Sequence, residues 1–167
     1  MNLPSIRFTY LLGFLVISIL LGAASYLQIH DGITPCPLCI FQRIGLATVG
    51  VVFFFGAAIN FRKVGSYFIA SASCVFAIFG IVFAGRQVWL QHLPPVGSGN
   101  CGASLEYMLQ VFPIQEVIKK VFIGGTECSQ VTWQFLHLSL AEWSLLCFVT
   151  LLILGIVQWR RVANRFS

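Results

Sequence analysis

Long stretches without a charged residue dominate the chain. Four such stretches cover residues 8–29, 44–61, 64–85 and 143–159. A helix needs roughly 20 apolar residues to cross about 30 Å of hydrocarbon. The last stretch has 17 residues, and the apolar residues just before it extend it to 139–159. The pattern therefore predicts an all-α membrane protein, a single domain over 1–167 with four transmembrane helices in an up-down bundle (about 8–29, 44–61, 64–85 and 139–159).

The composition agrees with this prediction. Charged residues make up 9% of the 167 residues and hydrophobic residues 58%, whereas roughly 25% of a typical soluble domain is charged. So few polar residues could not cover a soluble globule. Intrinsic disorder is also excluded, because disordered chains are poor in apolar residues and rich in charge. The chain is an integral membrane protein by composition alone.

The basic residues predict an orientation. Four spans place both termini on one side, and six of the ten Lys and Arg residues lie there. The other side, with loops 30–43 and 86–138, holds four. By the positive-inside rule both termini are cytoplasmic and both loops periplasmic. The net charge of +5 is then an orientation signal, and no nucleic-acid partner is expected. A cleavable signal peptide ending near Ser25 is the rival interpretation, but its apolar stretch exceeds the usual 7–15 residues.

The six cysteines fall into two groups. Cys74 and Cys147 lie within predicted spans, where a buried thiol usually serves as a small apolar filler. The other four lie in the two outer loops, in a compartment where disulfides persist; they are Cys36, Cys39, Cys101 and Cys128. Four cysteines allow three pairings. The pairing of Cys36 with Cys39 and of Cys101 with Cys128 is favoured, because two residues between thiols suit a redox-active dithiol.

The sequence Cys36-Pro37-Leu38-Cys39 stands at the mouth of the second span. Motifs with this spacing commonly have a lowered thiol pKa, and the thiolate is the species that attacks and leaves in exchange reactions. Arg43 follows Cys39 by four residues, so the two share a helix face if the helix begins near Cys39. Arg43 would then favour the thiolate. Alternatively it only anchors the helix at the membrane interface, and the spacing does not decide between these roles.

The spacing of the four outer cysteines argues against a metal or haem site. A structural zinc site usually takes two closely spaced pairs, but 26 residues separate Cys101 from Cys128. A c-type haem needs His directly after the motif, where Ile40 stands. No metal is therefore expected. The remaining alternative is a membrane scaffold protein whose two disulfides only staple its periplasmic loops.

The second outer loop contains a predicted amphipathic helix. Apolar residues recur with helical spacing from Ile114 to Phe122, Pro113 suits the helix start, and Gly124 follows its end. The helix is expected to lie on the membrane surface, or else to pack against a partner protein. Before it, the Gly- and Pro-rich stretch 94–100 predicts a loop that lets Cys101 reach another protein or the first cysteine pair.

The order of these motifs resembles the DsbB family of bacterial disulfide bond formation proteins over nearly the whole chain. The resemblance rests on four spans, Cys-Pro-Leu-Cys followed by Arg43, the Cys101 and Cys128 pair, and the stretch 133–146 before the last helix. It implies a thiol oxidase of the inner membrane with ubiquinone or menaquinone as cofactor. A soluble periplasmic DsbA-like protein would attack the Cys101–Cys128 disulfide and bond to Cys101. Electrons would pass to Cys36–Cys39, and Cys39 would react with quinone beside Arg43.

One position departs from the family pattern. Where relatives have a His after the third span, this chain has Gln87, which could hydrogen-bond a quinone oxygen but could not carry a proton. His92 is the candidate substitute. The thiol–quinone reductases related to vitamin K epoxide reductase are a neighbouring resemblance, but their C-x-x-C lies late in the helix bundle. Here the motif opens the second span, which favours the DsbB family.

Overall fold

The structure is a computed structural model that describes residues 5–30, 32, 36–59, 63–93, 110–123 and 134–166. Four long helices account for most of these residues: α1 (Ile6–His30), α2 (Pro37–Ala58), α3 (Lys63–His92) and α7 (Leu140–Phe166). A shorter helix, α5 (Ile114–Ile123), and two short strands, β1 (Gln134–Phe135) and β2 (Leu138–Ser139), complete the described part.

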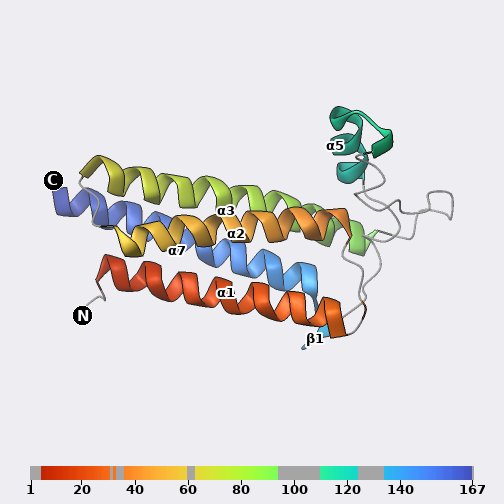
Figure 1. Cartoon of the computed structure of the whole chain (residues 1–167), viewed down its shortest axis with the longest axis horizontal. Coiled ribbons are helices and arrows are strands. Elements are labelled where there is room, and N and C mark those ends of the chain that lie inside the picture. The colour runs from red at the N-terminus through yellow and green to blue at the C-terminus, as the bar shows by residue number, and fades with distance from the viewer. Residues whose placement is uncertain are drawn as a thin grey trace.

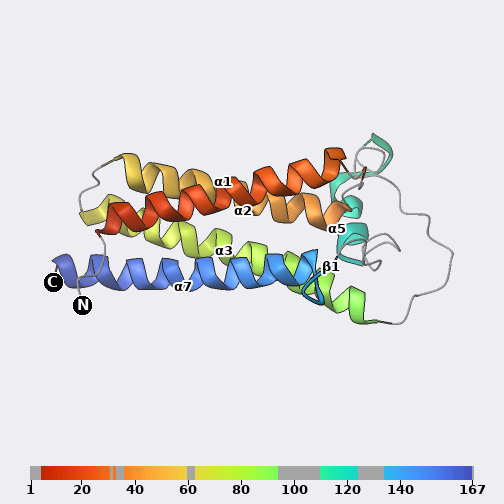
Figure 2. The same ribbon diagram turned by 90° about the horizontal axis from the view of Figure 1, so that it is seen from below.

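The four long helices lie side by side, and consecutive helices run in opposite directions (Figure 1). Helix α3 packs along both α2 and α7, and α1 packs mainly along α2. Both ends of the chain lie at one end of the bundle, whereas α5 and the β1–β2 hairpin lie at the other (Figure 2). This arrangement confirms the predicted all-α bundle with an even number of spans.

Each long helix is long and apolar enough to cross a membrane. Many of their large apolar side chains are exposed at the outside of the bundle, such as Ile19, Phe68 and Ile153. A soluble monomer rarely exposes so much contiguous apolar surface, so this surface fits contact with lipid. The chain is therefore a multi-pass membrane protein.

The helices extend beyond the uncharged stretches that predicted them. Helix α2 begins at Pro37, seven residues before the expected span, and includes Arg43 in its second turn. Helix α3 continues to His92 and α7 to Phe166. The cysteine motif thus belongs to the first turn of a helix instead of a preceding loop.

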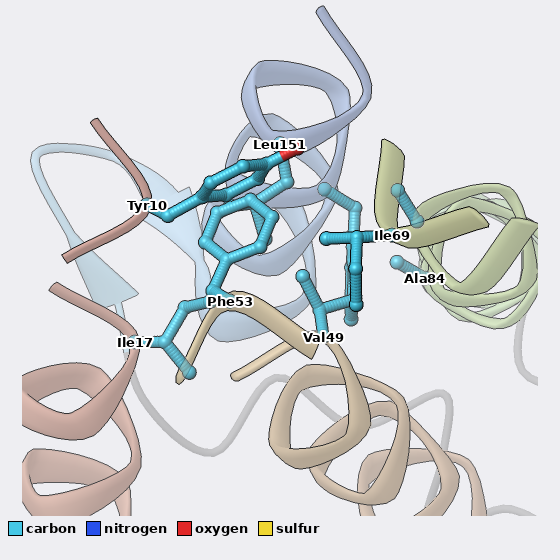
Figure 3. Packing of buried hydrophobic residues seen from close by; sticks show 9 residues of the cluster. Tyr10, Ile17, Val49, Phe53, Ile69, Ala84 and Leu151 are labelled. Carbon is cyan, nitrogen blue, oxygen red and sulfur yellow. The ribbon is translucent and has the colours of Figure 1, made fainter. Parts of the chain in front are cut away.

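The inside of the bundle contains tightly packed apolar and small residues. In Figure 3 the ring of Tyr10 lies against that of Phe53, with centroids 5.3 Å apart in an edge-to-face arrangement. Small residues let the helices approach: a Cβ added to Gly80 of α3 would lie 2.1 Å from the Phe148 ring of α7. Close van der Waals packing of this kind drives helix association in membranes, where burial from water contributes little.

Hydrogen bonds fix the start of α7 at the end of the bundle away from the termini. The backbone N–H of Ser139 donates to Glu142 Oε2 at 2.6 Å, and the Glu142 N–H donates to Ser139 Oγ at 3.3 Å. This reciprocal pair is a capping box. Ser139 Oγ also donates to Gln91 Oε1 of α3 at 2.8 Å, so the cap ties the ends of two helices together.

Candidate functional site

The cysteine motif forms the N-terminus of α2. Cys36 is the N-cap residue, with extended backbone angles (φ −65°, ψ 158°), and Pro37 is in the first turn. Proline restricts the residue before it to extended conformations and is itself well suited to the first helical position. The backbone N–H of Ile40 donates to the Cys36 carbonyl at 3.2 Å. The local sequence therefore places Cys36 at the N-cap and Cys39 in the first turn of the helix.

The two sulfur atoms of the motif lie next to each other. Cys36 Sγ donates a hydrogen bond to Cys39 Sγ at 3.0 Å. A disulfide has a sulfur–sulfur distance of about 2.05 Å, so an approach of about 1 Å would bring the two atoms to bonding distance. Cys39 is also near the positive end of the α2 dipole, which favours a thiolate. Cys39 Sγ thus receives a hydrogen bond from its motif partner.

Two glutamine side chains stand behind Cys39. Gln87 of α3 donates from Nε2 to Cys39 Sγ at 3.2 Å. Gln42 of α2 donates from Nε2 to Gln87 Oε1 at 2.6 Å. Both side chains are buried, with 5% of Gln42 and 4% of Gln87 exposed. Since buried amides are costly without partners, the three side chains form one connected polar group in an apolar bundle.

Arg43 connects the same turn of α2 to α1. Its guanidinium donates to the side-chain oxygen of Gln28 and, at 3.1 Å, to the backbone carbonyl of Ala24. An arginine within a membrane span is normally paired with polar or carbonyl groups or faces a cavity. Arg43 does both, because it also lines the cavity described next.

A cavity of about 120 Å³ opens beside Cys39 between α1, α2 and α7. Apart from Gln42, Arg43 and Ser144, the wall is largely apolar. For comparison, an apolar protein cavity of about 150 Å³ accepts benzene. The cavity thus has the size and character for one six-membered ring next to a thiol and a guanidinium. Its lining residues are Leu20, Leu21, Ala24, Cys39, Gln42, Arg43, Leu46, Leu140, Ala141, Trp143, Ser144, Cys147 and Phe148.

Helix α5 covers the motif from the end of the bundle. Val117 of α5 is buried, with 2% exposed, in a cluster with Cys36, Leu38 and Phe83. The helix predicted after Pro113 is present, whereas its placement on the membrane surface stays a prediction. Val117 on its apolar face packs against the chain's own bundle. Cys36 is consequently only 6% exposed.

The structure brings together most of the site residues that the sequence predicted. Cys36, Cys39, Arg43 and Gln87 meet around the start of α2; Gln87, however, contacts the rear of Cys39 and is not among the described residues that line the cavity. Cys101 and Cys128 lie outside the described residues.

The other nominated side chains lie apart from this group or at its edge. Cys147 of α7 is part of the cavity wall. Cys74 packs against Gly155, where an added Cβ would lie 2.8 Å from its sulfur. His92 is 69% exposed, and its Nε2 lies 3.9 Å from Glu142 Oε1.

Two residues of the site were missed by sequence reasoning. Gln42 follows Cys39 by three residues, so helical spacing alone could have placed it on the same face. Gln28, which binds Arg43, gave no such signal because it lies on another helix.

Fold and site together define a class: a four-helix membrane protein with a dithiol at the mouth of one helix and an apolar cavity beside it. Comparison with known proteins makes this specific. Residues 6–158 match the family described as "Disulfide bond formation protein DsbB", and the chain belongs to that DsbB family. Its role is accordingly disulfide bond formation, carried out as a disulfide oxidoreductase.

Individual relatives match over almost their full length. The "Disulfide bond formation protein B" of Methylococcus capsulatus is 42% identical over 159 residues, covering 95% of this chain and 97% of the relative. That of Nitrosococcus oceani is 37% identical, covering 96% and 95%. "Disulfide bond formation protein B 1" of Pseudomonas aeruginosa is 40% identical, covering 98% and 100%.

Proposed function

We propose that the protein reoxidises a periplasmic DsbA-like dithiol oxidase and delivers the electrons to a membrane quinone. The observation that carries this proposal is the position of Cys39, which is hydrogen-bonded to Cys36 Sγ at 3.0 Å and forms part of the wall of a ring-sized apolar cavity. A thiol pair that only stapled a loop would have no need of such a cavity.

The cavity residues fit a quinone headgroup. Apolar side chains from α1, α2 and α7 suit the two faces of a ring, and Arg43 offers a fixed positive charge where a quinone oxygen gains electron density. The contacts of Arg43 with Gln28 and Ala24 hold its guanidinium in position. A bound quinone, ubiquinone or menaquinone, would supply a two-electron, two-proton acceptor.

Electrons and protons balance when the Cys36–Cys39 pair is oxidised. When Cys36 and Cys39 form a disulfide, the dithiol loses two electrons and two protons, and the acceptor in the cavity takes up both. The thiolate form of Cys39 is favoured by the helix dipole and by the hydrogen bonds from Cys36 and Gln87. Cys39 is therefore the sulfur that faces the acceptor, and Cys36 is the sulfur that closes the disulfide.

The second pair, Cys101 and Cys128, would receive electrons from the soluble partner. In that exchange a partner thiolate attacks the Cys101–Cys128 disulfide, binds Cys101 and releases Cys128, and the second partner thiol then displaces Cys101. The reduced pair next reduces the Cys36–Cys39 disulfide by the same chemistry. Support for this part comes from the family membership and from the loop sequence around Cys101.

The protein would be oriented with both termini in the cytoplasm and the cysteine motif at the periplasmic face of the bacterial inner membrane. Both termini lie at the bundle end opposite the motif (Figure 2), and the basic residues concentrate near them. Because an oxidising compartment maintains disulfides, this orientation would place the cysteine pairs on the side of the membrane where their substrate is found.

Purified protein in detergent tests the proposal directly. With excess ubiquinone, it should oxidise a reduced thioredoxin-fold protein, and Cys39→Ser should abolish both thiol oxidation and quinone reduction. Cys74→Ser, at a thiol remote from the cavity, is the matched control and should retain activity. If Cys36→Ser and Cys39→Ser lower the thermal stability while oxidation continues unchanged, the two disulfides are structural staples of a membrane scaffold and the proposal is wrong.

A further inference from the structure

The amide of Gln87 offers two different atoms to the Cys39 sulfur. Its Nε2 lies 3.2 Å from Cys39 Sγ, and its Oε1 lies 3.5 Å from the same sulfur. An N–H donor stabilises a thiolate, whereas a carbonyl oxygen stabilises a thiol by accepting its S–H. The orientation of this one amide therefore decides which form of Cys39 is favoured.

Gln42 holds that orientation. Its Nε2 donates to Gln87 Oε1 at 2.6 Å, which is the shortest hydrogen bond of the group and the one made between two buried side chains. While Gln42 draws Oε1 toward itself, Nε2 is the nearer of the two Gln87 amide atoms to Cys39 Sγ, at 3.2 Å against 3.5 Å for Oε1. We propose that Gln42 is a positioning residue, which keeps the Gln87 N–H on the Cys39 sulfur and so maintains Cys39 as the reactive thiolate.

This inference deepens the proposed function, since it concerns the reactivity of the same thiol. No group is transferred by either glutamine. Among the residues that the structure describes, the charged and titratable groups that face Cys39 are Cys36 and Arg43 on α2 and, across the cavity, Cys147 on α7. All three stay unchanged when the amides are substituted, so an effect of the substitutions reports on the amide pair.

The test measures the thiolate itself, without quinone or partner. The reduced protein is alkylated with iodoacetamide across a pH series, and the modified Cys39 peptide is quantified by mass spectrometry. Gln87→Met removes the donor with little change in shape and should raise the alkylation midpoint by about one pH unit, which is a tenfold loss of thiolate below the midpoint. Gln42→Met should raise it by about half a unit.

A double-mutant cycle separates positioning from direct action. If Gln42 acts through Gln87, then Gln42→Met should have no further effect in a Gln87→Met background. Additive shifts would overturn the inference, because Gln42 would then act on Cys39 independently. A Gln42→Met profile identical to that of the unsubstituted protein would overturn it as well.

Gln158→Met provides the matched control. Gln158 of α7 is also a buried amide, with 1% exposed and no hydrogen-bond partner for its side chain among the described residues. Its substitution by Met should leave the alkylation midpoint of Cys39 unchanged. If Gln87→Met cannot be purified, comparison of Gln42→Met with Gln158→Met still decides, since only the former should shift. The alkylation series contains no quinone, so it is independent of the quinone assay. If the substitutions shift the alkylation midpoint but the protein does not reduce quinone, the proposed function is refuted and this inference stands.

Discussion

Replacing Arg43 offers the sharpest test of the cavity as a quinone site. Arg43→Met keeps an unbranched side chain of similar length but removes the charge and every donor. Hydrogen bonds to charged groups contribute about 1.5–3 kcal/mol, and the lower end applies because the side chain is only half-buried. A loss of about 1.5 kcal/mol corresponds to about a tenfold weaker affinity. The apparent KM for quinone should therefore rise about tenfold.

Arg43→Lys separates the charge from the shape of the guanidinium. A lysine keeps the positive charge, but its single ammonium lacks the planar fork that reaches Gln28 and Ala24 together. We expect an intermediate increase of a few fold in KM. Because the quinone oxygen gains electron density as it is reduced, kcat should also fall in Arg43→Met, and less in Arg43→Lys.

The assay follows quinone reduction by its absorbance, with reduced thioredoxin-fold protein held at saturation. Arg160→Met, at the opposite end of the bundle, controls for the loss of a basic residue and should leave KM unchanged. Circular dichroism verifies that the variants remain folded. Should Arg43→Met bind quinone as tightly as the unsubstituted protein, Arg43 is only an anchor of α2 at the membrane interface.

Two further predictions concern packing. Gly80→Ala places a methyl group against the Phe148 ring and should lower the free energy of unfolding by denaturant by about 1–3 kcal/mol. Gly85→Ala, with open space around the added carbon, should leave the stability unchanged. Equal stability of the two variants would contradict the described packing. Val117→Asp should undock α5, because a buried charge is costly, and should increase the rate of alkylation of Cys36 severalfold. Substitution of an exposed residue of α5 by Asp should leave that rate unchanged. If Val117→Asp does not increase the rate, α5 does not shield Cys36.

The beginning of α2 shows where sequence patterns were insufficient. The uncharged stretch starts after Arg43, so the span was expected from residue 44. The helix begins at Pro37 instead. It can include Arg43 because the guanidinium is hydrogen-bonded to Gln28 and Ala24 inside the bundle. Counting charges along the chain cannot detect a charge that another helix neutralises.

Helix α5 shows the opposite case. Its apolar residues lie on one face with helical spacing, and that face supplies Val117, which is buried in the structure. The four long helices lack such a signal, because they are apolar around their circumference. A helix with apolar residues on every side does not reveal which face turns inward.

The sequence by itself determined the features that depend on neighbouring residues. It specified four apolar helices, the clustering of basic residues near the termini, and a pair of cysteines at the mouth of the second span. The tertiary structure decided which side chains surround that dithiol. Gln87 lies 48 residues from Cys39 along the chain, and the cavity requires residues from α1 and α7 as well as α2. Such contacts depend on the rotation and crossing of whole helices, which are set by close packing at positions such as Gly80 and not by hydrophobicity along the chain.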